Sequence, residues 1–353
     1  MTQLFGQTAA AFCVMPQDAA VTRPRNFSAH LEQDFVVMSR GPKFEDSFDL
    51  DSGYDIARRV CLYRTQTAPE NRAVCWISDK LKKNAFTLKY QLGRLIDEGT
   101  YAKVYRCYTN DSFEKEYAVK VMDKQQMISL GMLPYLRREV SILKQIRNAS
   151  GVCKFIDFME TGDKFYLVLE LLHGGSLDRE FFTYEECELR SFTFQVAKTL
   201  KHLHGIGIFH ADLQLGNICK VNKSTACTKV KLVDFGLSDY CSRGKKHCRC
   251  VGNLYYAAPE MLLQKEYEGP EIDIWALGVC LFKLATGYRP FKNSDAIING
   301  KFMIPLEDED QLSDECKNLI TEILQVDPAK RLNIEQILDH PFFDACREDT
   351  NKI

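Results

Sequence analysis

The sequence has no uninterrupted apolar run of the roughly 18 residues needed to cross a bilayer, so we expect no membrane-spanning helix. The segment Met1–Arg25 includes a short apolar patch but no basic stretch ahead of it, which argues against a secretory signal peptide. An excess of either charge is also lacking: 46 Lys and Arg residues nearly balance 48 Asp and Glu residues. This balance gives no reason to expect a nucleic acid or an anionic membrane as partner.

Apolar side chains, in contrast, are plentiful enough for a large core, because 45% of the 353 residues are hydrophobic. The 14 cysteines would predict a disulfide framework in a small secreted protein, but they are scattered through predicted helices and strands. A reducing compartment is therefore expected. We predict a cytoplasmic protein, with the nucleus as an alternative.

Residues 1–84 form an irregular N-terminal extension, in which no period of 2 or 3.6 residues persists. Prolines and glycines interrupt it, and Phe44–Asp55 is acidic and aromatic. We interpret the extension as mostly irregular or disordered. Two interpretations stay open. The extension is either a species-specific tail or a regulatory or docking segment that contacts the domain.

From Phe86 onward the pattern changes from irregular to β-like and then helical. Strands are predicted over Phe86–Leu95, Ala102–Tyr108, Tyr117–Met122 and Phe165–Glu170. Helices are predicted over Tyr184–His204 and Ile272–Thr286, the second nearly all apolar and therefore buried. A strand-rich front with one main helix and a helical back half indicate an α+β protein with two lobes.

Three motifs fall in the strand-rich half. The stretch DEGTYAKV over Asp97–Val104 joins two predicted strands and contains Gly99, where the backbone can be approached most closely. By itself this motif could equally be a hairpin turn. YAVKV places Lys120 on a strand, and LRREVSILKQI places Glu139 on a helix.

The helical half carries acidic motifs. HADLQLGN contains Asp212, a carboxylate that can accept the proton of a hydroxyl group. VKLVDFG contains Asp234, a hard oxygen ligand suited to magnesium. APE ending at Glu260, a DxWxxG helix and DPAKRL with Arg331 follow in order, and HPFF ends the domain.

In this order and at these spacings the motifs resemble the eukaryotic protein kinase domain of serine/threonine type. Details of the second half are most similar to the calcium/calmodulin-dependent and AMP-activated kinase group. The resemblance implies a protein-kinase-like two-lobed fold over residues 85–343, with an N-lobe over 85–171, a C-lobe over 172–343 and a short tail over 344–353. It also implies that Glu260 and Arg331 form a buried ion pair.

The resemblance further implies a site for ATP and Mg²⁺. Lys120, paired with Glu139, would hold the α- and β-phosphates, and Asp212 would be the base. Asn217 and Asp234 would hold magnesium, and Gln214 stands where relatives carry a lysine near the γ-phosphate. The adenine and phosphates would contact Gly99, Val104, Ala118, Lys120, Leu169, Glu170, Leu172 and Cys219.

Two departures bear on regulation. Ala211 replaces the arginine that precedes the catalytic aspartate in most relatives and receives the activation-loop phosphate. Arg249 occupies the position that relatives phosphorylate. The arginine that binds the phosphate and the residue that carries the phosphate are thus both absent. We therefore predict a kinase that does not require activation-loop phosphorylation. Its loop would be ordered by packing or by fixed charge from Lys245, Lys246 or Arg249.

Two further departures leave the activity open. Gln214 brings no charge, and Asn253 stands where serine/threonine kinases carry the threonine that hydrogen-bonds the lysine replaced by Gln214 and the base. A nucleotide-binding pseudokinase acting as a scaffold or allosteric partner is therefore the alternative. Phosphorylation of a small molecule is a third hypothesis. The complete activation segment favours a protein substrate, phosphorylated on serine or threonine. As stated above, no nucleic acid or membrane is expected as partner.

Two smaller hypotheses concern the surroundings of this site. Relatives that select substrates with an arginine upstream of the phosphorylated residue bind that arginine with acidic residues. This chain has Ser176, Gly216 and Lys283 at those positions, so the same preference is not expected. Asp178 could replace the missing acidic residues only weakly. Several cysteines and a histidine lie near or within the activation segment and allow zinc binding, redox sensitivity or no role: Cys219, Cys227, Cys241, His247, Cys248 and Cys250.

Overall fold

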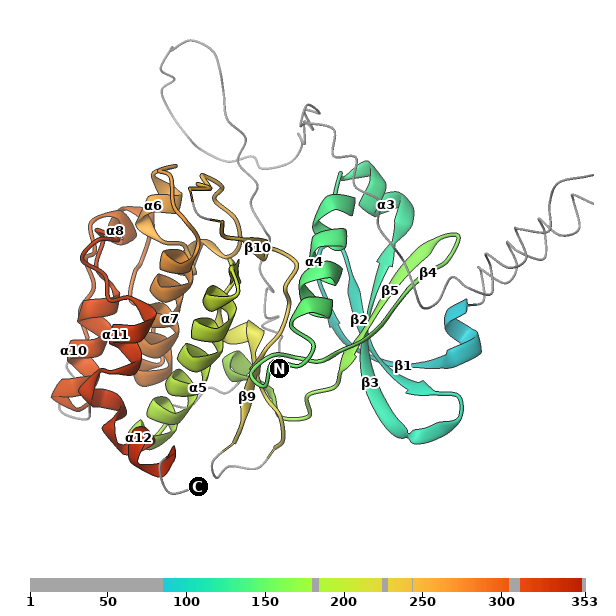
Figure 1. The fold of residues 1–353 in the computed structure, drawn as a ribbon, viewed down its shortest axis with the longest axis horizontal. Helices are drawn as coiled ribbons and strands as arrows, with labels where there is room; N and C mark the ends of the chain where they lie inside the picture. The colour runs from blue at the N-terminus through green and yellow to red at the C-terminus, as the bar shows by residue number, and fades with distance from the viewer. Residues whose placement is uncertain (1–84, 180–183, 224–227, 243, 305–311, 351–353) are drawn as a thin grey trace, which may run out of the picture.

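The computed structural model describes residues 85–179, 184–223, 228–242, 244–304 and 312–350. The prediction for residues 1–84 therefore lies outside the described part of the chain. The described residues form a β-sheet lobe and a helical lobe (Figure 1), the two-lobed arrangement predicted from the sequence. No helix among these residues is long and apolar enough to cross a membrane.

The N-lobe is an antiparallel five-stranded sheet with the order β1-β2-β3-β5-β4. Its strands are β1 (Tyr90–Glu98), β2 (Lys103–Thr109), β3 (Ser112–Asp123), β4 (Phe155–Glu160) and β5 (Lys164–Glu170). Two helices follow β3, namely α3 (Lys124–Ser129) and α4 (Leu133–Gln145). Helix α4 turns Leu136, Ile142 and Leu143 into the main core, which extends into the C-lobe.

The prediction that a strand starts at Phe86 was wrong, because residues 85–89 are helical and β1 begins at Tyr90. The reason lies in packing. The ring of Phe86 stacks on Tyr166 with centroids 4.2 Å apart and joins a small second core with Tyr90 and Val119. Tertiary contact with this sheet overrides the local β-like pattern.

The C-lobe is built around two long helices. Helix α5 (Glu186–Gly205) begins at a capping box formed by Glu185 and Glu188, and α7 (Pro270–Thr286) is buried along nearly its whole length. The other helices in the described part of this lobe are α6 (Pro259–Leu262), α8 (Ser294–Ile298), α10 (Asp314–Ile323), α11 (Ile334–Leu338) and α12 (Asp344–Thr350). Helix α12 occupies most of the segment that was expected to be a short tail.

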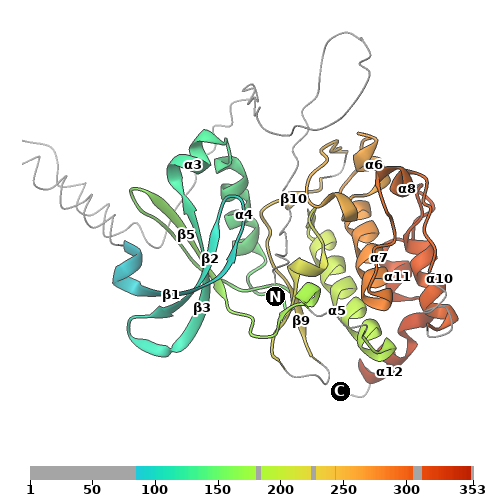
Figure 2. The same cartoon turned by 180° about the vertical axis from the view of Figure 1, so that it is seen from behind.

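Short strands and single 3-10 turns position the loops between the lobes. They are β6 (Gly175–Ser176), η1 (Leu177–Arg179), β7 (Ile208–Phe209), η2 (Leu215–Asn217), β8 (Ile218–Lys220), β9 (Val230–Leu232), β10 (Asp239–Tyr240), η3 (Leu254–Tyr256) and η4 (Pro341–Phe343). They pair as β6-β8-β9 and β10-β7. Figures 1 and 2 both show β9 and β10 at the junction of the lobes.

The predicted ion pair between Glu260 and Arg331 is confirmed. Both side chains are almost fully buried, and the guanidinium donates to the two carboxylate oxygens at 2.8 and 3.0 Å. The pair ties α6 to the segment before α11, which holds the end of the activation segment on the C-lobe core. An unpaired charge at this depth would be costly, so each residue requires the other.

Candidate active site

Three charged side chains meet between the lobes: Lys120 from β3, Glu139 from α4 and Asp234 from the turn after β9. Nζ of Lys120 lies 2.9 Å from Oε1 of Glu139 and 3.0 Å from Oδ1 of Asp234. The Glu139 side chain is 4% exposed, whereas that of Asp234 is 48% exposed. The lysine is therefore anchored from inside, and the aspartate faces the solvent side of the junction.

The charges of these three groups support one another. Burial opposes the charge of Lys120, but Asp234 and Glu139 outweigh it and hold the pKa of the ammonium above its ordinary value. The Lys120 charge is in turn the main cause that lowers the pKa of Asp234. Burial raises the pKa of Glu139, and Lys120 counteracts that rise. Lys120 is a fixed cation and Asp234 a fixed anion at neutral pH.

A tight turn presents Asp234. Its backbone adopts a φ of 59°, in the left-handed region, and the N–H of Gly236 donates to Oδ1 at 3.3 Å. A Cβ at Gly236 would lie 3.1 Å from the same oxygen, which favours glycine here. The Phe235 ring is buried against His210, with centroids 4.9 Å apart, and fixes the turn on the C-lobe.

Asp212 is surrounded by neutral hydrogen-bond donors. Nε2 of Gln214 lies 3.1 and 3.2 Å from its two carboxylate oxygens, and Nδ2 of Asn217 lies 3.0 Å from Oδ2. Burial and the nearby Asp234 raise the pKa of Asp212 to about 7, while the bonds from Asn217, Gln214 and the Asn253 main-chain N–H lower it. Asp212 is thus a carboxylate held in place by amides.

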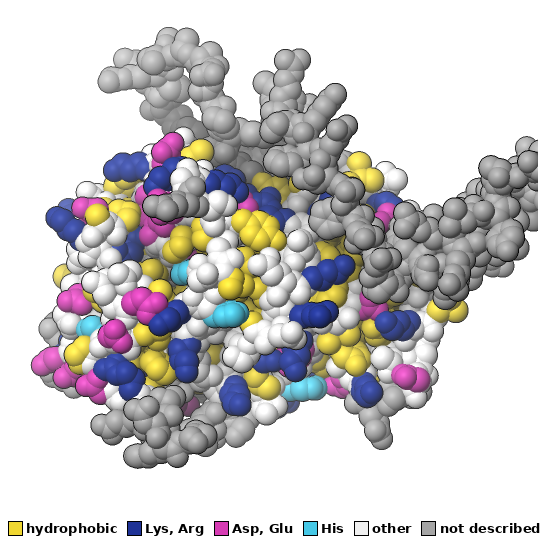
Figure 3. Space-filling model, viewed as in Figure 1, with side chains coloured by type: hydrophobic (Ala, Val, Ile, Leu, Met, Phe, Trp, Pro, Cys, Tyr) yellow, Lys and Arg dark blue, Asp and Glu magenta, His cyan; other side chains and the backbone are white. Residues whose placement is uncertain are grey.

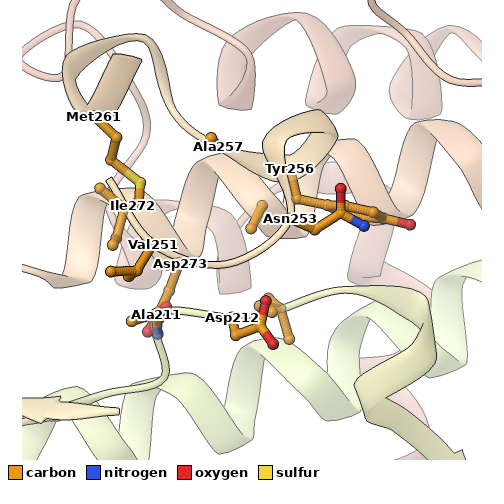
Figure 4. Close-up of a pocket in the computed structure, with 11 residues that line it drawn as sticks. Ala211, Asp212, Val251, Asn253, Tyr256, Ala257, Met261, Ile272 and Asp273 are labelled. Carbon is orange, nitrogen blue, oxygen red and sulfur yellow. Dashed lines mark hydrogen bonds between the residues drawn. The ribbon is translucent and has the colours of Figure 1, made fainter. Parts of the chain in front are cut away.

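Asp273, the aspartate of the DxWxxG helix, supports this loop through contacts that were not predicted from the sequence. Its carboxylate accepts hydrogen bonds from the N–H groups of His210 and Ala211, at 2.7 and 2.9 Å, and lies 2.9 Å from Nε2 of His204. These bonds hold Ala211 at a φ of 63°, which L-residues rarely adopt. Figure 4 shows Ala211 and Asp273 among the side chains that line a small pocket next to Asp212.

The strand register brings together the residues predicted to surround the adenine. Val104 on β2 lies opposite Lys120, and Ala118 on β3 lies opposite Leu169 on β5. Leu172 lies two residues after the end of β5, at the connection between the lobes.

Two more predicted residues lie at this connection. Cys219 on β8 pairs with Ser176 of β6, which follows Leu172 in the chain. The carboxylate of Glu170 is held by Nζ of Lys231 at 2.6 Å and by the N–H of Lys154 at 3.0 Å. These contacts stiffen the connection.

Gly99 lies in the turn between β1 and β2, where its N–H donates to the carbonyl of Ala102 at 2.9 Å. A Cβ at Gly99 would meet only this carbonyl, at an ordinary distance of 3.6 Å. The packing of the chain therefore does not require glycine here. A smooth backbone edge is nevertheless what a phosphate group needs for close approach.

The activation segment is tied together by Asp239, which the sequence did not mark. Nη2 of Arg249 lies 2.7 Å from Oδ2 of Asp239, and Nζ of Lys245 lies 3.6 Å from Oδ1. Arg138 on α4 also forms an ion pair with Asp239. Lys246 instead pairs with the exposed Glu268 at 2.7 Å. One carboxylate thus gathers cations from the segment and from the N-lobe helix.

The cysteine-rich part of the activation segment does not assemble a metal site. Within the described ranges no three His, Cys, Asp or Glu side chains are grouped so as to hold a metal ion. His247 is instead packed between the rings of Phe209 and Tyr267. Burial raises the pKa of Cys241 and Cys250, which disfavours the reactive thiolate. Cys227 lies outside the described residues.

Charges on the surface are of both signs. On the face in Figure 3, basic and acidic side chains are interspersed. Asp178, which was considered as a substitute for the acidic residues that select an upstream arginine, is bound to Lys283 in an ion pair. Its charge is therefore already neutralised.

Comparison with known proteins gives the family. Residues 90–343 match the family model of the protein kinase domain. The chain is 33% identical to CBL-interacting serine/threonine-protein kinase 13 of Arabidopsis thaliana over 72% of its length, and 31% identical to calcium-dependent protein kinase 13 of the same plant over 85%. It is 34% identical to the human SNF-related serine/threonine-protein kinase over 72%. These matches cover 51%, 57% and 34% of the relatives themselves.

Proposed function

Because this chain belongs to the protein kinase domain family, we propose that it transfers the γ-phosphoryl group of ATP to serine or threonine hydroxyls of a protein substrate. One observation carries the proposal: Lys120 and Asp234 converge at 3.0 Å, on the same junction that presents Asp212 and Asn217. Relatives named as serine/threonine kinases support the choice of acceptor. We assign the catalytic domain to residues 85–343.

Magnesium fits the two residues proposed to hold it. Asp234 offers a half-exposed carboxylate, and Asn217 uses its Nδ2 on Asp212, so that Oδ1 is the atom that can ligate. Both ligands are hard oxygens, the kind that magnesium prefers. Magnesium held by Asp234 and Asn217 would supply positive charge that offsets the negative charge developing on the phosphates.

The other residues act through charge and position. Lys120, held by Glu139, places a fixed cation where it can contact the phosphates. Asp212 orients the substrate hydroxyl and accepts its proton, and the amide of Gln214 keeps the carboxylate in place. Main-chain groups of Glu170 to Leu172 would bind the adenine between Val104, Ala118, Leu169 and Cys219.

We further propose that this kinase does not require phosphorylation of its activation segment. Such phosphorylation orders a loop by supplying an anion that pairs with arginines. Here Asp239 already supplies an anion, and Arg249 and Arg138 already pair with it. The Asp239 side chain is only 10% exposed, so solvent screens these pairs weakly.

A pseudokinase is the second candidate, because Gln214 next to Asp212 lacks the charge of a lysine. Magnesium-dependent transfer of labelled γ-phosphate to a degenerate serine and threonine peptide library separates the two. The full chain is compared with Asp212→Asn and with a control, Asp314→Asn, whose side chain is 98% exposed. Transfer by the wild type and the control but not by Asp212→Asn supports the kinase. No transfer with ATP binding retained supports the pseudokinase.

A further inference from the structure

Two side-chain amides lie in a row beside Asp212. Nδ2 of Asn253 donates to Oε1 of Gln214 at 3.1 Å, and Nε2 of Gln214 donates to the Asp212 carboxylate at 3.1 and 3.2 Å. The row begins at the main-chain N–H of Tyr255, which donates to Oδ1 of Asn253 at 3.1 Å. Every hydrogen bond in the row therefore points toward Asp212.

The direction of the row follows from what each group can do. In the ionised form that accepts a proton, the Asp212 carboxylate only accepts hydrogen bonds, so the NH₂ group of Gln214 must face Asp212 and its oxygen must face Asn253. A donor is then needed on Asn253. Asn253 supplies one because its own oxygen is occupied by the Tyr255 N–H. If either amide were rotated by 180°, its oxygen would face another hydrogen-bond acceptor and its NH₂ group would face another donor.

The turn that carries Asn253 is shaped to reach Asp212. Gly252 has a φ of 81°, and a Cβ there would lie 2.7 Å from Oδ1 of Asp212. The main-chain N–H of Asn253 also donates to Asp212. Figure 4 shows Asn253 and Asp212 on facing loops. The turn thus contacts the carboxylate directly and also through Gln214.

We propose that Asn253 is a positioning residue, which holds Gln214 in the one amide orientation that donates to Asp212. The two amides then work only as a pair, and Gln214 without Asn253 is free to turn its oxygen toward the carboxylate. This inference rests on the proposed kinase function. It adds that the two departures from the family pattern are mutually dependent.

Two substitutions remove the donor while preserving the fold of the turn. Asn253→Ser keeps an oxygen that can cap the N–H groups of η3, but its side chain is too short to reach Gln214. Asn253→Asp also keeps the cap, and its second oxygen would oppose Oε1 of Gln214. We expect each to lower kcat at least about tenfold, as loss of a positioning contact does, with KM for ATP unchanged.

A double-mutant cycle tests whether Asn253 acts through Gln214. Asn253→Ser should lower kcat in the wild type and have little further effect in Gln214→Ala. A second measurement needs no turnover: in the nucleotide-free protein, the Gln214 side-chain NH₂ signals in ¹⁵N-edited spectra should be protected from water exchange. Asn253→Ser should abolish this protection, whereas Asp314→Asn should keep it.

The outcomes are separable from those for the proposed function. An equal loss of kcat from Asn253→Ser in both backgrounds, or no loss in either, overturns the inference and leaves a kinase. Unprotected Gln214 signals in the wild type also overturn it. If neither the wild type nor any variant transfers phosphate, the proposed function is overturned, and this inference with it.

Discussion

Nη2 of Arg249 lies 2.7 Å from Oδ2 of Asp239, so the middle of the activation segment is joined to its beginning by a fixed ion pair. The same carboxylate pairs with Arg138 on α4, the helix that also carries Glu139. Asp239 therefore couples the order of the segment to the position of Glu139, and through Glu139 to Lys120.

Asp239→Asn should lower activity at least about tenfold, because an amide forms weaker hydrogen bonds to guanidinium groups than a carboxylate does. The initial rate of phosphate transfer measures the loss, with Asp314→Asn as the control for a change of charge on the surface. The segment of the Asp239→Asn protein should also be cleaved faster by a protease. Unchanged activity and unchanged cleavage would show that Asp239 does not order the segment.

Gly252→Ala and Gly244→Ala form a matched pair, because both glycines have a φ of 81°. A Cβ at Gly252 would lie 2.7 Å from Oδ1 of Asp212, whereas at Gly244 it would meet nothing within 4 Å. Both variants should therefore bear a similar backbone cost of about 1 kcal/mol. Only Gly252→Ala should lose activity, measured as kcat at saturating ATP. Equal activities would contradict a close approach to Asp212.

Glu260→Gln should destabilise the protein by about 3–5 kcal/mol, because it leaves the Arg331 charge buried without its partner. The free energy of unfolding in urea measures this. Lys246→Met is the control, since it breaks the exposed pair with Glu268 and should cause no measurable change. A small effect of Glu260→Gln would mean that the pair does not hold the end of the activation segment on the core.

Stability should fall as the pH decreases, in part because of His340. Its Nδ1 accepts the N–H of Phe342 at 3.1 Å and its Nε2 lies 2.8 Å from Oδ1 of Asn318, so the neutral ring fits the site. Burial lowers the pKa of His340, although Glu322 opposes the change. The unfolded chain, with an ordinary pKa of about 6.5, then binds the proton first.

This stabilisation is complete above about pH 6.5 and is lost as the pH falls through the lowered native pKa. His340→Asn keeps an acceptor for the Phe342 N–H and cannot titrate. Its free energy of unfolding should therefore decrease less between pH 7 and the acid range than that of the wild type. Parallel curves for the two proteins would rule out a contribution from His340.

Much of the fold followed from motif order, because each motif belongs to one type of local structure. DEGTYAKV was expected to join two strands, and it covers the end of β1, the turn with Gly99 and the start of β2. The apolar run over Ile272–Thr286 was expected to be a buried helix and is α7. The helix at residues 85–89 was missed, since its stability comes from the contact of Phe86 with Tyr166. Strand β4 was not predicted either.

The parts of the site that escaped prediction depend on long-range contacts. Asp239 has no distinctive neighbours in sequence, and its partner Arg138 comes from another lobe. The direction of the hydrogen bond between Asn253 and Gln214 was not predicted either, because the orientation of an amide depends on all the groups around it. The resemblance did indicate that position 253 contacts Gln214 and Asp212, because relatives carry there a threonine that hydrogen-bonds the corresponding lysine and the base, and a glycine precedes Asn253.

The proposed kinase activity without activation-segment phosphorylation is best measured as the initial rate of magnesium-ATP-dependent phosphate transfer by the full chain after phosphatase treatment, with Asp212→Asn treated identically. We predict that the treated wild type retains its rate, that the substrate is phosphorylated on serine or threonine, and that Asp212→Asn is inactive. Loss of the wild-type rate on phosphatase treatment would show that phosphorylation is required, and an Asp212→Asn protein as active as the wild type would show that Asp212 is not the base.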